Sequence, residues 1–260
     1  MTDFQNQVAI VTGTTGIGRA SAKRLARGGA QVLACGIDTA GNDSLKREAE
    51  ADKLTLTVRK CDIASPNDIE STVKAAVQLF GGVDVLVNAA AINPYGTVTE
   101  TDLATWNQCF AVNVTSIFLF ARYCVPEMKK RGEGAIVNIA SVQGHACQRG
   151  VVAYATSKGA VLALTRALAL DHAADGIRVN SISPGSIRTP MLELAARTLS
   201  PELPVEQVFQ RFGEAHPIGR IVTPEEVAEL IAFLSSRTAS FCTGADYLVD
   251  GGLLAGIAVR

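Results

Sequence analysis

The stretch that decides the fold is residues 8–18, VAIVTGTTGIG, near the start of the chain. It begins with a short apolar run, which is typical of strands buried on both faces of a sheet. A glycine-rich turn follows, and a helical pattern then extends over 19–27. This order of strand, glycine turn and helix is the context of a dinucleotide site, because glycines let backbone approach a pyrophosphate and the helix N-terminus supplies free N–H groups. The residues expected to bind the cofactor here are Gly13, Gly16, Ile17 and Gly18. An ordinary strand-to-helix turn is the alternative interpretation.

The alternation of short apolar runs and helical patterns continues to the end of the chain. No linker, repeat or low-complexity tract interrupts it. The predicted strands are 8–11, 31–37, 54–58, 83–87, 135–139, 177–182 and 247–249. The predicted helices are 19–27, 67–80, 101–130, 152–173 and 224–235. We therefore expect one α/β domain over residues 1–260 with a Rossmann fold, in which helices cover both faces of a doubly wound parallel sheet of about seven strands.

The composition of the 260 residues limits the classes of function. Hydrophobic residues make up 48% of the chain, enough for a sizeable core, and a formal net charge of −1 offers no basic footprint for nucleic acid. No stretch approaches the ~18 consecutive apolar residues of a membrane span, and the polar N-terminus does not resemble a signal peptide. The six Cys have no paired spacing, which indicates a reducing compartment, and the three His have no metal-ligand spacing. We expect a cytoplasmic protein that binds a small molecule and no metal.

A candidate acid–base pair lies in the helix predicted over 152–173. Tyr154 and Lys158 are four residues apart, so their side chains share one helical face. An isolated Tyr has a pKa of about 10. We expect the neighbouring ammonium to lower the pKa of Tyr154, so that it exchanges a proton with a substrate hydroxyl near neutral pH. Ser141 follows the strand at 135–139, where its hydroxyl would hold the substrate oxygen against Tyr154. The Tyr–Lys spacing alone is weak, since it also arises by chance.

Other polar residues follow the predicted strands, at the edge where open parallel sheets bind ligands. Asp38 ends the second strand, and it either accepts hydrogen bonds from an adenosine ribose, caps the next helix, or does both. Asp62, followed by Ile63, either faces the adenine or caps a helix. The strand at 83–87 ends in Asn88 and three alanines, whose small side chains would let a cofactor lie against the strand end.

Two stretches depart from the regular pattern. Asn113 lies in an otherwise apolar helical segment, where its amide bonds to nearby backbone, or bends the helix and holds a water. Residues 191–212 interrupt the alternation and contain Pro201 and Pro204. We interpret the region 186–218 as an insertion over the site that would act as a substrate lid.

Together these motifs resemble the short-chain dehydrogenase/reductase family over nearly the whole chain, from Val8 to Gly252. The catalytic tetrad of that family is matched in residue type, order and spacing by Asn113, Ser141, Tyr154 and Lys158. Later family motifs are matched by Asn180, Pro184-Gly185, Thr189-Pro190-Met191 and residues 247–252. Chance does not account for agreement at so many positions.

The resemblance implies a role for each matching residue. Tyr154 would be the acid–base group, Lys158 would lower its pKa and hold the nicotinamide ribose, and Ser141 would position the substrate oxygen. Asn113 would anchor a water in the proton relay. Further cofactor contacts would come from Pro184, Gly185, Ile187 and Thr189. Family members are usually homotetramers or homodimers built from the helices around 103–130 and 152–173.

Two motifs differ from the usual family pattern. The glycine loop usually reads TGxxxGxG, whereas residues 12–18 read TGTTGIG and are one residue short. This difference would shift the pyrophosphate loop and weaken cofactor binding, so no individual contact is assigned to Thr14 or Thr15. The motif after the fourth strand usually reads NNAG, whereas residues 88–91 read NAAA, and the added methyl group of Ala91 would crowd the loop.

We therefore expect an oxidoreductase that moves hydride between a nicotinamide cofactor and a secondary alcohol or ketone. Residues 186–192 and 251–256 look similar to those of sugar and polyol dehydrogenases, which favours a free aldose or a polyol. The side chains expected to contact it are Ser141, Gln143, Gln148 and Tyr154. One alternative is a 3-oxoacyl-[acyl-carrier-protein] reductase, which would need a basic patch beside the cleft. Another is a cofactor-sensing protein without turnover, against which the complete tetrad argues.

The expected cofactor is NAD rather than NADP. The glycine loop and the end of the second strand offer no cation for a 2′-phosphate, and Asp38 would repel one. Arg19 is nearby, but it lies in the first turn of a helix. The usual NAD-selecting Asp of the family sits where this chain has Gly36, so Asp38 lies two residues farther along.

Overall fold

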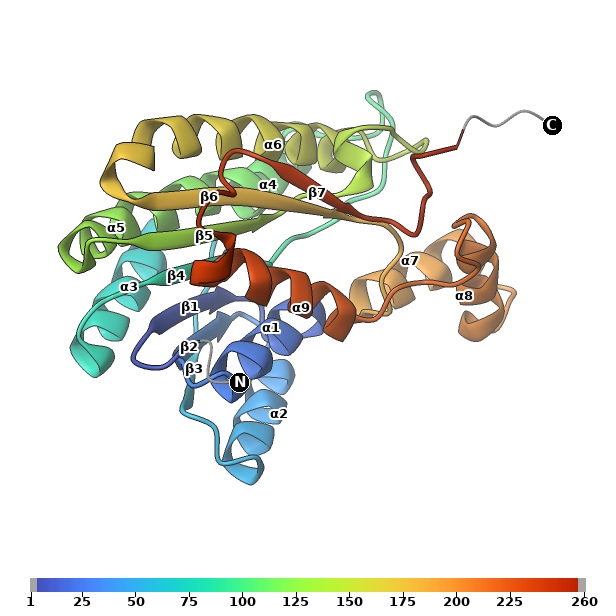
Figure 1. The fold of residues 1–260 in the computed structure, drawn as a ribbon. Coiled ribbons are helices and arrows are strands. Elements are labelled where there is room, and N and C mark those ends of the chain that lie inside the picture. Colours follow the sequence, from blue (N-terminus) through green and yellow to red (C-terminus); the bar gives the residue numbers. More distant parts are fainter. Residues whose placement is uncertain (1–3, 257–260) are drawn as a thin grey trace.

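The computed structural model describes residues 4–256 and contains one parallel sheet between two layers of helices (Figure 1). Within these residues the sheet has seven strands in the order β3-β2-β1-β4-β5-β6-β7. The strands are β1 Val8–Thr12, β2 Gln31–Gly36, β3 Leu56–Lys60, β4 Val85–Asn88, β5 Gly134–Ile139, β6 Ile177–Pro184 and β7 Asp246–Val249. The predicted fold class is confirmed, and strand boundaries differ from the predictions by one or two residues, as at β3.

Helices cover both faces of the sheet. α1, α2 and α9 contribute buried side chains to the core on one face, and α3, α5 and α6 to the core on the other. The helix bounds are α1 Gly16–Arg27, α2 Thr39–Ala51, α3 Pro66–Phe80, α4 Leu103–Phe110, α5 Ser116–Arg131, α6 Val152–His172, α7 Pro190–Leu199, α8 Val205–Glu214 and α9 Pro224–Ser235. The insertion predicted at 191–212 forms α7 and α8, which extend to one side of the molecule in Figure 1.

The apolar composition of β1 follows from its central place in the sheet. Ala9 and Val11 pack into the core under α1 and α9, while Ile10 packs into the core under α3 and α5. Successive side chains of a strand point to opposite faces, so both faces of β1 need apolar residues. Fully burying a side chain of this size contributes about 1.5–3 kcal/mol each for Val11 and Ile10.

One helical run is apolar over an unusual length. The continuous segment Leu103–Arg131, made of α4, a π-helical turn at Ala111–Thr115 and α5, is long and apolar enough for a membrane span, with a mean hydropathy of 1.4. Half of its most apolar window is buried inside the molecule. Phe120 and Cys124 of α5 lie fully inside the core against the sheet. Its composition is therefore that of a helix packed in a protein core.

The sheet order places the carboxyl ends of the strands around one crevice. β1 pairs with β2 on one side and with β4 on the other, so the chain reverses its direction across the sheet at β1. Ligands of open α/β sheets bind at such a switch point, beyond the carboxyl ends of the strands.

Candidate active site

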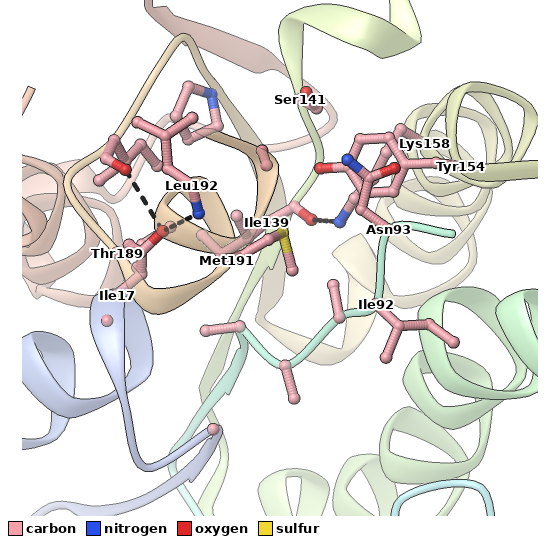
Figure 2. Close-up of a pocket in the computed structure, with 18 of the residues that line it drawn as sticks. Ile17, Ile92, Asn93, Ile139, Ser141, Tyr154, Lys158, Thr189, Met191 and Leu192 are labelled. Atoms are coloured by element: carbon pink, nitrogen blue, oxygen red, sulfur yellow. Dashed lines mark hydrogen bonds between the residues drawn. The ribbon is translucent and has the colours of Figure 1, made fainter. Parts of the chain in front are cut away.

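A cavity of about 710 Å³ lies along the carboxyl edge of the sheet. The loops that follow β1 to β6 form its wall, together with α6, α7 and the segment after β7. Figure 2 shows Ile17 and Thr189 on one side, and Ser141, Tyr154 and Lys158 on the other. The cavity therefore joins the glycine turn to the Tyr–Lys pair, as the sequence predicts.

α1 begins at this cavity without a side-chain cap. Its N-cap residue, Thr15, makes no capping hydrogen bond, and the first turn contains no acidic residue. The N-termini of α2, α3, α4, α7 and α9 are each capped by a side chain. The first N–H groups of α1 remain available for an anion, so a pyrophosphate fits this end of the cavity.

The glycines of the turn are needed for its backbone geometry. Gly13 and Gly16 have φ angles of +92° and +50°, which other residues rarely adopt. A Cβ on Gly18 would lie 2.2 Å from the carbonyl oxygen of Gly13, so α1 can start directly under the turn only with glycine there. Gly18 is not part of the cavity wall, and it acts by close packing. The shortened loop therefore still presents the start of α1 to the cavity.

Asp38 caps a helix and also lines the cavity. Its Oδ1 accepts a hydrogen bond from the N–H of Ala40 at 3.1 Å, which makes Asp38 the N-cap of α2. Gly36 and Asp62 lie on the same part of the wall, together with Ile63. The carboxylate of Asp62 accepts the N–H of Ala64 at 2.9 Å, whereas α3 is capped by Ser65. Asp62 therefore stabilises a turn and is not the cap of α3.

Arg19, the nearest cation to the glycine turn in the sequence, is held by a carboxylate. Its Nε donates to Glu48 at 3.2 Å, and a second guanidinium nitrogen pairs with the other oxygen of Glu48. Lys23 donates to the same carboxylate at 2.8 Å. The guanidinium is therefore directed to α2, and a 2′-phosphate would have to compete with Glu48 for it.

Ser141 lies at the end of β5, where the strand turns into a short 3₁₀ helix, Val142–Gly144. Its Oγ accepts the N–H of Gln143 at 3.1 Å and so caps this turn. Ser141, Gln143 and Gln148 all line the cavity. The three predicted substrate contacts from this loop thus face the same space as Tyr154.

α6 carries Tyr154 and Lys158 into the cavity on one helical face. Both residues are buried, with 8% and 3% of their surface exposed. The Lys158 Nζ donates to the carbonyl oxygen of Ile139 at 2.7 Å and lies 5.5 Å from the centroid of the Tyr154 ring. Figure 2 shows this hydrogen bond beside the Tyr154 ring.

Burial dominates the ionisation of this pair. It raises the pKa of Tyr154 to about 12, while the nearby Ser141 hydroxyl acts in the opposite direction. Burial also lowers the pKa of Lys158 to about 8. The expectation that Lys158 lowers the pKa of Tyr154 is therefore wrong for the protein alone, because the ammonium bonds to Ile139 and the phenol is removed from water.

Asn113 lies in the π-helical turn between α4 and α5 and has several partners. Its amide nitrogen donates to the carbonyl oxygen of Ile92 at 2.9 Å and to Ser157 Oγ at 3.0 Å. Its Oδ1 accepts the N–H of Ile92 at 2.9 Å. Asn113 does not line the cavity; it fixes the segment after β4 against α6. The helix is thus irregular at this residue, and π-helical turns of this kind are frequent at functional sites.

Hydrogen bonds between buried polar side chains link β4, β5 and α6. Asn88 donates to Asn138 Oδ1 at 2.8 Å, and Asn138 donates to Thr165 Oγ1 at 3.0 Å. Asn88 and Asn138 are direct partners in the β4–β5 register, and Thr165 belongs to α6. Asn88, expected to bind the cofactor, is not part of the cavity wall and instead joins β4 to β5.

The predicted cofactor residues near α7 lie on the cavity wall. They are Pro184, Gly185, Ile187 and Thr189. Thr189 caps α7 by accepting the N–H of Leu192 at 3.3 Å. Met191, Leu192, Leu199 and Phe212 of the insertion also line the cavity, which gives the substrate end an apolar side.

Sequence reasoning missed several wall residues. Asn93 and Tyr95 come from the irregular segment after β4, and Gln108 comes from α4. The Oδ1 of Asn93 and the Oε1 of Gln143 are buried without a hydrogen-bond partner. Asn93 stands two residues after the strand-end motif 88–91, and this position is the one signal that would have identified it.

Within residues 4–256, no group of three or more His, Cys, Asp or Glu side chains could hold a metal ion.

Comparison with known proteins shows similarity over the whole length of the chain. The family described as enoyl-(acyl carrier protein) reductase matches residues 11–254. A cis-4-hydroxycyclohexanecarboxylate dehydrogenase of Sinomonas cyclohexanicum is 37% identical over 254 residues, covering 97% of this chain and 98% of its own.

Solved structures are similar to the same extent. The ligand-free aldohexose dehydrogenase of Thermoplasma acidophilum has a TM-score of 0.91 and 34% identity, and the match covers 100% of this chain and 98% of that one. A variant of actinorhodin polyketide ketoreductase with NADPH also has a TM-score of 0.91, with 36% identity, and the match covers 97% of this chain and 98% of that one.

Proposed function

Because the chain belongs to the short-chain dehydrogenase/reductase family, we propose that it transfers hydride reversibly between NAD and a neutral secondary alcohol or its ketone. The observation that carries this proposal is that one cavity contains both an uncapped helix N-terminus and a buried Ser–Tyr–Lys group. The first fits a dinucleotide pyrophosphate, and the second fits a hydroxyl that gains or loses a proton.

The residues that would hold the dinucleotide lie in order along the wall. The N–H groups at the start of α1 would bind the pyrophosphate, Asp38 the adenosine ribose, and Lys158 the nicotinamide ribose. Ile187 and Thr189 would contact the nicotinamide. When bound, the oxidised nicotinamide supplies the hydride acceptor and a positive charge.

The protein's own groups would manage the substrate proton. Ser141 would donate a hydrogen bond to the substrate oxygen and hold it against the Tyr154 hydroxyl. Tyr154 would take the proton as an alcohol is oxidised and return it as a ketone is reduced. With a pKa of about 12 in the protein alone, Tyr154 needs additional positive charge before it acts as a base near neutral pH.

For the substrate, we propose a sugar or polyol. Asn93, Gln143 and Gln148 are uncharged polar residues on the substrate side of the cavity wall, and their amides would form hydrogen bonds with hydroxyl groups. The similar aldohexose dehydrogenase structure supports this class. Among the described residues of the cavity wall, the acidic side chains are Asp38 and Asp62, which lie at the end assigned to the adenosine and not at the substrate end.

A second candidate is a less polar cyclic alcohol. Met191, Leu192 and Phe212 give the substrate end an apolar side that a sugar would not need. The relative that acts on a hydroxycyclohexane ring supports this class. The description of the matching family favours a reductase of carrier-bound acyl groups, which the substrate panel therefore includes, whereas a cofactor sensor without turnover has no comparable observation in its favour.

A substrate panel tests the proposal. Purified protein is assayed for NADH formation with aldohexoses, polyols, cyclohexanol and cyclohexanediols, and for NADH or NADPH oxidation with the matching ketones and an acyl thioester ketone. Turnover with sugars above cyclohexanols supports the first candidate, and the reverse order supports the second. Tight NADH binding without turnover on any member would favour the sensor.

A further inference from the structure

His216 occupies a buried position between three segments at the cavity. It lies two residues after the end of α8, and only 3% of its surface is exposed. Its Nδ1 lies 2.6 Å from the carbonyl oxygen of Asp250, just after β7. Its Nε2 lies 3.3 Å from the backbone nitrogen of Ser186, just after β6. The imidazole therefore joins the loop after β6 to the turn after β7.

The two partners define the state of the ring. The Asp250 carbonyl oxygen can only accept, so Nδ1 carries the hydrogen and donates it. Nε2 is then an acceptor for the N–H of Ser186. A protonated imidazole has N–H groups at both nitrogens and would leave the Ser186 N–H facing another donor. The observed contacts therefore need the neutral ring.

Both segments held by His216 form walls of the cavity. Gly185, Ser186 and Ile187 line it on the side assigned to nicotinamide, and Leu253 and Leu254 line it after β7. The ring packs closely against the first of these, since a Cβ on Gly185 would lie 2.4 Å from its Cε1. The carboxylate of Asp250 fixes the second by accepting the N–H groups of Gly252 and Leu254 at 3.0 and 2.9 Å.

Few charges face this ring. Segments 184–187 and 215–219 carry no titratable side chain other than His216, and segment 250–254 carries only Asp250. Two charged residues flank segment 215–219 in the sequence: Glu214, at the end of α8, and Arg220, which is paired with Glu226.

We propose that His216 is a positioning residue that, in its neutral form, holds the 184–187 loop and the 250–254 turn at the spacing the cofactor needs, and that releases the loop when protonated. The inference rests on the proposed dinucleotide site. It adds a dependence of cofactor binding on pH that originates away from Tyr154 and Lys158.

Three substitutions separate the two contacts. His216→Gln can place an oxygen near Nε2 and keep an acceptor for Ser186. His216→Asn can place a nitrogen near Nδ1 and keep a donor to Asp250. His216→Phe fills the volume and removes both. His172→Gln is the matched control, since His172 lies at the end of α6 and bonds to Asp175.

The Kd for NADH, measured by its fluorescence, is the first readout. At pH 8 we expect His216→Phe and His216→Asn to weaken binding by about 5-fold or more, because the partly buried N–H of Ser186 loses its partner. His216→Gln should stay within about twofold of wild type. As the pH falls from 8 to 5.5, wild-type and His172→Gln binding should weaken relative to His216→Gln binding, in which the protonation of Lys158 still contributes a pH dependence.

Hydrogen–deuterium exchange of the 183–188 backbone is a second readout that needs no ligand. At pH 8, exchange there should be faster in His216→Phe than in wild type and His216→Gln. If the wild-type protein does not bind NADH, the cofactor proposal fails, and the exchange result alone decides on His216. Unchanged exchange in His216→Phe, or a pH dependence of NADH binding in His216→Gln equal to that of wild type, would overturn the inference.

Discussion

The ammonium of Lys158 donates a hydrogen bond to the carbonyl oxygen of Ile139 at 2.7 Å, and not to the hydroxyl of Tyr154, one helical turn away. The last residue of β5 thus fixes the position of the cation from below. In the protein alone, burial is therefore the main influence on the pKa of Tyr154 and raises it. The charge of Lys158 is therefore available to a ligand bound in the cavity, such as the nicotinamide ribose proposed above.

The first prediction concerns the Tyr154 hydroxyl. Tyr154→Phe should lower kcat by at least ~100-fold, because the group that exchanges the proton is removed. The Kd for NADH should change little, because the ring and the glycine turn remain. Tyr123→Phe on α5 is the matched control and should keep kcat. Near-normal kcat in Tyr154→Phe would exclude the proposed mechanism.

The second prediction concerns the buried charge of Lys158. Its pKa of about 8 in the folded protein lies below the ordinary value of 10.5, so between these two pH values the unfolded chain binds more protons. The free energy of unfolding contributed by this group should therefore rise with pH from about 8 to 10.5 and be lost as the pH falls through 8.

Urea unfolding of wild type and Lys158→Met at pH 7 and 9.5, without ligand, measures this contribution. We expect the difference between the two proteins to change by about 1–3 kcal/mol in favour of wild type at the higher pH. An equal pH dependence of both proteins would mean that Lys158 titrates as an exposed lysine. The same variant should lose turnover and NADH affinity together.

The third prediction is a preference for NAD over NADP. Asp38 on the wall would repel a 2′-phosphate by roughly 1–4 kcal/mol at a few ångströms, which corresponds to about 10- to 1,000-fold. Asp38 stands two residues beyond Gly36, so the low end is expected. The measurement is kcat/KM with each cofactor for wild type and Asp38→Asn, which keeps the cap of α2. A preference for NADP in wild type contradicts the assignment, and an unchanged ratio in the variant means that Asp38 is only a helix cap.

The fourth prediction concerns the short glycine loop. A small residue inserted between Thr14 and Thr15 would tighten cofactor binding if the missing residue weakens the loop, and would not do so if the neighbouring backbone has already adapted. In the structure, Gly16 and Gly18 already fit closely against Thr189 and Gly13. We therefore expect a glycine inserted there to weaken NADH binding by about threefold or more, since loss of this fit costs of the order of 1 kcal/mol. Tighter binding after insertion would show that the native loop is too short.

The fifth prediction concerns assembly as a homotetramer or homodimer through α4, α5 and α6. Each of these helices exposes a large apolar side chain, namely Leu103, Phe118 and Leu170. Such side chains are usual at contacts between subunits. Light scattering should show a smaller assembly for Leu170→Glu than for wild type, while Leu79→Glu on α3 should not change the mass. A monomeric wild-type protein would exclude this proposal.

The parts of the site that the sequence predicted are those encoded locally. Residues 8–18 form a strand, a turn and a helix start within one stretch, and the Tyr154–Lys158 spacing depends only on the helical period. The wall residues Asn93 and Tyr95 were missed because they lie in an irregular segment that tertiary packing brings to the cavity. The pKa of Tyr154 was misjudged because burial and the partner of Lys158 depend on the folded surroundings.

The Asn88–Asn138 hydrogen bond has a consequence for how the site is specified. A slip of one residue between β4 and β5 would move the two amides to opposite faces of the sheet and leave them without each other as partners in an apolar core. Burying unpartnered amides costs free energy, whereas the same slip between strands of Val and Ile alone would bury no polar side chain. The Asn88–Asn138 pair thus helps to specify the register of β4 and β5. Because β5 carries Ser141 and β4 also pairs with β1, which carries the glycine turn, a wrong β4–β5 register would displace Ser141 from the glycine turn, and such forms are disfavoured together with the misplaced active sites.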